Sequence, residues 1–90
     1  MAVYLVTYDL NKPGQNYAKL LETIKKYSWA RLSESSYAIS TVATADAILR
    51  EIRAVIDQGD HVYVISLHQP HSGFGPQEVN NWLQGNLKSC

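Results

Sequence analysis

An acidic residue ends the first apolar stretch of the chain. Residues 2–8 read Ala-Val-Tyr-Leu-Val-Thr-Tyr, the β-branched and aromatic composition of a buried strand, and Asp9 follows them directly. A carboxylate at this place has two interpretations. It can accept backbone hydrogen bonds in a turn, or it can ligate Mg²⁺ or Mn²⁺, because these ions prefer oxygen ligands. One carboxylate is too few for a tight site, whereas two copies that meet across a two-fold axis would supply two.

Strands and helices alternate along the chain in an order that must position this acid. The predicted elements are a strand at 3–9, a helix at 17–27, two short strands at about 30–34 and 36–42, a helix capped by Thr44 and ended by Gly59, a strand at 61–67 and a short helix at 76–84. Along the first strand, Asp9 shares a face with Val3 and Thr7, and Tyr8 lies on the other face.

This order predicts an α+β, ferredoxin-like fold, in which a βαββαβ chain forms an antiparallel sheet with two helices on one face. We expect residues 1–90 to form a single domain, with 68–90 as a C-terminal extension that carries the short helix. The first and last strands are predicted to be central. The helix-free face is apolar and needs cover from the C-terminal segment, a second copy of the chain or both, so we expect a homodimer.

Composition limits the partners of the protein. Eight basic and eight acidic residues give a formal net charge of zero, whereas a dedicated nucleic-acid binder usually carries a basic excess. Contact with DNA or RNA would therefore need a local patch, a metal ion or a symmetric pair of subunits. No apolar run approaches the roughly 18 residues of a membrane span, and no secretory signal is visible. With Cys90 as the single cysteine, we expect a cytoplasmic protein without a membrane partner.

Other residues whose side chains could bind metal, bind phosphate or react have simpler structural interpretations. Imidazole suits zinc or nickel, yet the spacing of His61, His68 and His71 matches no recognised site, and a strand start and a loop explain them. Several cations, among them Arg31 and Arg53, could form a basic rim, although solvated helix faces are the commoner meaning of such residues. Cys90 is terminal, and we expect no catalytic role for it.

The stretch YLVTYDL, which ends on Tyr8 and Asp9, resembles the first strand of the small CRISPR-associated nuclease family usually called Cas-two, whose wider superfamily includes the VapD toxins. The resemblance covers roughly residues 3–67. The segment ESSYAIS is similar to that family's second-strand region, with Ser36 as the counterpart of its serine. Small bacterial proteins labelled SinR-like share YLVTYDLNKPGQNY, the SES segment and a final helix of the pattern seen at Trp82, Leu83, Asn86 and Leu87.

The resemblance implies a metal-dependent endonuclease that acts on DNA or RNA with Mg²⁺ or Mn²⁺. In that family the first-strand aspartate binds the metal together with its symmetry mate in a homodimer, and this role falls on Asp9. The implied catalytic residues are Asp9, Tyr8 and Ser36, and the candidates for nucleic-acid binding are Lys12, Lys19 and Arg31.

The alternative is a non-catalytic dimeric scaffold that presents two symmetric surfaces to a protein or nucleic acid, with Asp9 in a structural role. The family usually carries arginines soon after the acid, where this chain has only Lys12 and Lys19. That difference and the zero net charge favour the scaffold, and the resemblance favours the nuclease.

Overall fold

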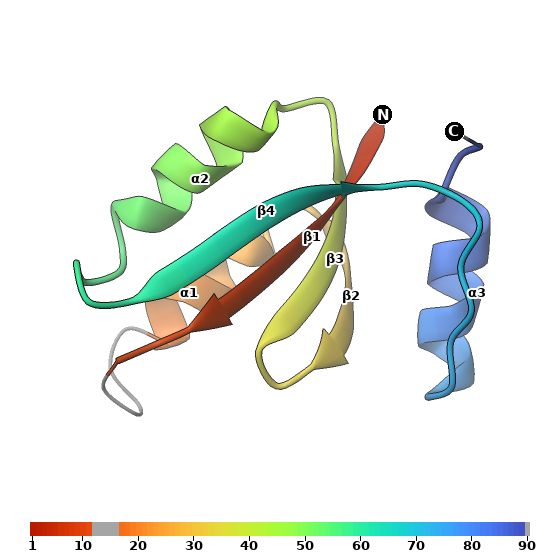
Figure 1. Cartoon of the computed structure of the whole chain (residues 1–90), viewed down its shortest axis with the longest axis horizontal. Helices are drawn as coiled ribbons and strands as arrows, with labels where there is room; N and C mark the ends of the chain where they lie inside the picture. Colours follow the sequence, from red (N-terminus) through yellow and green to blue (C-terminus); the bar gives the residue numbers. More distant parts are fainter. Residues whose placement is uncertain (12–16, 90) are drawn as a thin grey trace.

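A computed structural model describes residues 1–11 and 17–89 of the chain (Figure 1). The elements are β1 (Ala2–Asp9), α1 (Tyr17–Ile24), β2 (Ser28–Ser33), β3 (Ser36–Thr41), α2 (Ala45–Arg53), β4 (His61–Leu67) and α3 (Gln77–Asn86). The predicted α+β class and ferredoxin-like βαββαβ order are confirmed, with the short C-terminal helix following β4. No helix among these residues is long and apolar enough to cross a membrane.

The four strands form one antiparallel sheet in the order β2-β3-β1-β4. The central strands are therefore β1 and β3. The prediction that the last strand is central was wrong, because β4 lies at the edge. The two crossover connections are interleaved, because β3 lies between β1 and β2, and β1 lies between β3 and β4.

The helix boundaries differ from the predicted ones where the chain turns early. α1 ends at Ile24 instead of residue 27, and β2 then starts at Ser28. α2 begins as expected, because the Thr44 side chain accepts a hydrogen bond from the backbone N–H of Ala47 at 3.1 Å. It ends at Arg53, however, and Gly59 lies in the turn that precedes β4 rather than at the helix end.

The main core lies between the sheet and the helices α1 and α2, which cover the same face (Figure 1). Ile24 and Ile52 are each 1% exposed, and Leu21 and Ile56 pack against this core while remaining partly exposed. The remaining buried residues of this cluster are Val6, Tyr8, Leu10, Leu20, Tyr37, Ile39 and Ile48. The predicted placement of the two helices on one face is thus confirmed.

α3 covers part of the opposite face. Leu83 and Leu87 pack on Val3 and Ala38 in a second buried cluster, and the indole N–H of Trp82 donates to Ser28 Oγ at 3.2 Å. Figure 1 shows α3 beside β2, away from β4. The C-terminal segment therefore covers β2, β3 and the Val3 end of β1, and Leu67 at the end of β4 packs against the same cluster. Among the described residues no helix covers the other end of the β1–β4 pair, from Leu5 and Ile65 to Asp9 and His61, which is called the uncovered half of the sheet below.

Candidate functional site

The strand register places Asp9 on the face of the sheet opposite α1 and α2. Asp9 ends β1, and its partner in β4 is His61, the first residue of that strand. Thr7 pairs with Tyr63 in β4 and with Ser36 in β3. Direct partners in an antiparallel sheet present their side chains on the same face, and so do alternate residues of one strand. These five residues are called the Asp9 patch below.

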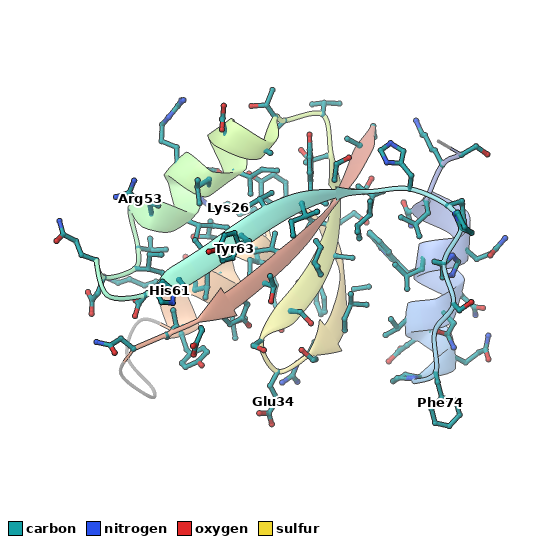
Figure 2. The ribbon with its side chains drawn as sticks, in the orientation of Figure 1. Lys26, Glu34, Arg53, His61, Tyr63 and Phe74 are labelled. Atoms are coloured by element: carbon teal, nitrogen blue, oxygen red, sulfur yellow. The ribbon has the colours of Figure 1, made fainter. Side chains whose placement is uncertain are left out.

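The Asp9 patch is open. Asp9 and His61 are exposed, Tyr63 is 65% exposed, and Ser36 and Thr7 are half-buried. Figure 2 shows His61 and Tyr63 close together on β4, on the side of the strand that faces the viewer. Within residues 1–11 and 17–89, the carboxylate of Asp9 and the imidazole of His61 accept and donate no hydrogen bond. Both side chains are therefore available to a ligand.

The turn role that a strand-end acid often plays belongs to Asp60. Its Oδ1 accepts from the backbone N–H of Asn11 at 2.6 Å, and its Oδ2 accepts from that of Asp57 at 2.8 Å. Gly59 lies so close that a Cβ there would stand 3.0 Å from Asn11 Nδ2. The N–H two residues after Asp9, the usual donor of an Asx-turn, is thus engaged by a different acid.

Tyr8 lies on the other face from Asp9. It is 4% exposed, and its hydroxyl donates to the backbone carbonyl of Glu34 at 3.0 Å. Its ring meets Tyr17 edge-on, with 6.1 Å between centroids. Burial, followed by the neighbouring Tyr37 and Tyr17, raises the pKa of Tyr8 to about 12. Tyr8 therefore stays protonated at neutral pH and ties the end of β1 to the β2–β3 turn.

The other residues named from the sequence are spread over the molecule. Ser36 shares the face of Asp9, with its Oγ 2.6 Å from Ser33 Oγ. Arg31 lies on edge strand β2, which β3 separates from β1, and its Nε donates to the carbonyl of Ser33 at 3.3 Å. Lys19 is exposed on α1, in the helix layer across the sheet. Lys12 lies outside the described residues.

A cavity of about 430 Å³ adjoins the patch between α2 and β4. Its wall includes Ile56 and Val62, and Arg53, His61 and Tyr63 bring polar groups to it. Figure 2 shows Arg53 at the end of α2 nearest the start of β4. Sequence reasoning did not connect Arg53 or His61 with Asp9. The available signal was the strand start at residue 61, because an antiparallel β4 beside β1 puts its first residue near the end of β1.

One chain by itself offers few metal ligands. In the part of the chain that the structure describes, no three His, Cys, Asp or Glu side chains gather where they could hold an ion. Asp9 and His61 form a pair that provides one carboxylate and one imidazole. These are donors that divalent ions accept, and a second copy of the chain would double them to four.

Comparisons with known proteins agree with this architecture. A family model described as CRISPR associated protein Cas2 matches residues 1–73. The crystal structure of a hypothetical protein from Thermus thermophilus is similar in fold, with a TM-score of 0.68 and 21% sequence identity over 83% of this chain and 92% of that chain. At this identity the likeness concerns the fold alone. No curated protein sequence matches the chain significantly.

Proposed function

The chain belongs to the CRISPR associated protein Cas2 family, and we propose that it is a metal-dependent phosphodiesterase that cleaves DNA or RNA at the Asp9 patch of a homodimer. The observation that carries the proposal is the state of Asp9. It is an exposed carboxylate at the end of a central strand, and no described residue hydrogen-bonds to it. An acid without a hydrogen-bond partner among the described residues is suited to bind a ligand.

The uncovered half of the sheet is the surface on which two copies would meet. Tyr63 is 65% exposed and Ile65 is 49% exposed on this side, next to Leu5 and Thr7 of β1. A two-fold interface uses the same patch on both subunits. Such an interface over β1 and β4 would bury these apolar side chains and bring Asp9 near the partner's Asp9.

The two Asp9 carboxylates would hold one Mg²⁺ or Mn²⁺ ion. When bound, this ion supplies Lewis-acid stabilisation of the attacked phosphate and lowers the pKa of a bound water. The protein supplies the position of the substrate. Arg53, beside the patch, would bind a neighbouring phosphate through its guanidinium fork, and the exposed ring of Tyr63 offers a surface on which an unpaired base can stack.

The remaining residues have supporting parts in this proposal. The Ser36 hydroxyl, on the face of Asp9, would contact the sugar-phosphate chain. Tyr8 acts as a positioning residue, because its hydroxyl donates to the Glu34 carbonyl and so holds the end of β1 from the face opposite Asp9. Lys12, Lys19 and Arg31 are candidates for contacts with a longer strand of nucleic acid outside the site.

A dimeric scaffold without catalytic activity is the second candidate. The net charge of zero favours it, because such a chain has no general attraction for phosphates. In this function the two-fold surface would bind a partner macromolecule, and Asp9 would contribute only charge to the interface.

A cleavage assay separates the two functions. Single-stranded DNA, duplex DNA and RNA are incubated with wild type, Asp9→Asn and Asp46→Asn, with Mg²⁺, with Mn²⁺ and with EDTA. Asp46 is an exposed acid in the first turn of α2 and serves as the matched control. We expect ion-dependent cleavage by wild type and Asp46→Asn, and a loss of at least about 10²-fold in Asp9→Asn. If Asp9→Asn cleaves as fast as wild type, or if wild type cleaves nothing with any ion, the nuclease proposal is refuted and the non-catalytic scaffold remains.

A further inference from the structure

The geometry points to His61 as a second metal ligand beside Asp9, so that a dimeric site would bind a transition-metal ion such as Ni²⁺, Zn²⁺ or Mn²⁺ more tightly than Mg²⁺. This inference rests on the proposed function, because it concerns the ion held by Asp9. It adds a ligand and a metal preference that a site of two carboxylates would not have.

The placement of the two side chains is the first argument. Asp9 and His61 are direct partners across β1 and β4. In an antiparallel pair, the Cβ atoms of such partners lie about 4.5–5.5 Å apart. Bonds of about 2.0–2.2 Å from carboxylate oxygen or imidazole nitrogen to zinc fit between side chains at this separation. A carboxylate and an imidazole at these positions can therefore reach one ion with the backbone unchanged.

The availability of their ligand atoms is the second argument. Both side chains are exposed, and neither hydrogen-bonds to any residue that the structure describes. The nearby acid Asp60 is different, because both of its oxygens already accept backbone hydrogen bonds. Asp9 and His61 thus both present free ligand atoms at this end of the sheet, within the described chain.

The number of ligands is the third argument. A single chain provides two, and no group of three exists among the described residues. Two copies related by a two-fold axis would provide two carboxylates and two imidazoles, which complete a four-coordinate site. The site is therefore incomplete without the partner, and we expect one ion for every two chains.

The donor types determine which ion binds. Imidazole suits Zn²⁺, Ni²⁺, Cu²⁺ and iron, and affinities of mixed nitrogen and oxygen sites rise from Mn²⁺ to Ni²⁺. Mg²⁺ prefers oxygen ligands and keeps several waters. His61 should therefore add affinity for Ni²⁺ and Zn²⁺ and leave the binding of Mg²⁺ to Asp9 nearly unchanged.

The chain provides a matched control for this histidine. His68 is also exposed and directly follows β4, whereas His61 begins the strand. At about 3.3 Å per residue the Cα atoms of the two histidines are separated by roughly 23 Å. His71 is less suitable, because its Nδ1 lies 2.8 Å from Gln69 Oε1.

The test is isothermal titration of untagged protein with NiCl₂, ZnCl₂ and MgCl₂, using wild type, His61→Gln, His68→Gln and Asp9→Asn. We expect wild type and His68→Gln to bind Ni²⁺ at least about 10-fold more tightly than Mg²⁺, with one ion per two chains. His61→Gln should lose at least about 10-fold in Ni²⁺ affinity and keep its Mg²⁺ affinity, and Asp9→Asn should lose both. Circular dichroism of the metal-free variants checks that each is folded.

Two results would overturn the inference: His61→Gln binds Ni²⁺ as wild type does, or His68→Gln loses as much affinity as His61→Gln. In either case cleavage with Mg²⁺ that depends on Asp9 would leave the proposed function intact. Conversely, the wild type could cleave nothing while the His61→Gln variant binds Ni²⁺ more weakly than wild type does. This result would refute the nuclease and support the metal site.

Discussion

Asp9 ends β1 directly opposite His61, the first residue of β4, on the face of the sheet that α1 and α2 leave open. The pair brings together residues 52 positions apart in the sequence through the register of one edge strand. Thr7 and Tyr63 form the next pair on the same face. The sequence resemblance singled out Asp9, on the β1 side of this pair, and the place of His61 on the β4 side follows from the fold.

The core under α2 should be sensitive to truncation. Ile52 is 1% exposed and packs between α2 and the sheet, so Ile52→Ala should lower the free energy of unfolding by about 2–5 kcal/mol. Val42→Ala is the control, because Val42 is 85% exposed, and its effect should stay within about 0.5 kcal/mol. Urea denaturation followed by circular dichroism measures both. Equal midpoints for the two variants would contradict the packing described for α2.

Stability should fall at high pH because two tyrosines are held in their neutral form. Burial raises the pKa of Tyr8 to about 12, and burial together with a hydrogen bond to Glu51 raises the pKa of Tyr27 to about 12, from an ordinary value of 10.0. Between these values the folded chain binds more protons than the unfolded chain, so the free energy of unfolding decreases as the pH rises. Their contribution is fully present below pH 10.0 and is lost as the pH passes about 12.

Urea denaturation of wild type and Tyr8→Phe at a series of pH values from 8 to 12 tests this dependence. The variant should be less stable near pH 8 by about 1 kcal/mol, because the hydrogen bond to the Glu34 carbonyl is lost. Its stability should then decline less steeply above pH 10. Parallel curves for the two proteins would show that the Tyr8 hydroxyl titrates as it does in water.

The homodimer has a direct test on the uncovered half of the sheet. Wild type should scatter light as a particle of twice the chain mass of 10.1 kDa. Ile65→Glu places a charge among apolar side chains at the proposed interface and should yield folded monomers, since Ile65 is already 49% exposed in one chain. Val42→Glu, in the bend that follows β3 and outside the paired residues of β1 and β4, should remain dimeric. A monomeric wild type at high concentration would remove the dimer and the shared metal site together.

The element order was sufficient to predict the fold, because hydrophobic periodicity and caps act locally. The Thr44 cap and the strand at 61–67 agree with the structure, and the opposite directions of Tyr8 and Asp9 follow from strand alternation alone. The position of β4 at the sheet edge and its pairing with β1 are tertiary properties. The sequence therefore did not show that His61 lies beside Asp9, or that Arg53 lines the adjoining cavity.

The central claim is that Asp9 holds a divalent ion between two copies of the chain. The most direct measurement is the melting temperature of wild type and Asp9→Asn, each with EDTA and with millimolar Mn²⁺. An ion at ten times its dissociation constant stabilises the folded dimer by about 1.4 kcal/mol, and each kcal/mol raises the melting temperature of a domain this size by about 4–8 °C.

We predict that Mn²⁺ raises the melting temperature of wild type by several degrees and leaves Asp9→Asn unchanged. We also predict that in EDTA the variant melts at or above the wild-type temperature, because the substitution removes the repulsion between two carboxylates. A wild type that ignores the ion, together with an Asp9→Asn variant that melts earlier, would show that the carboxylate only holds the strand end and would contradict the account.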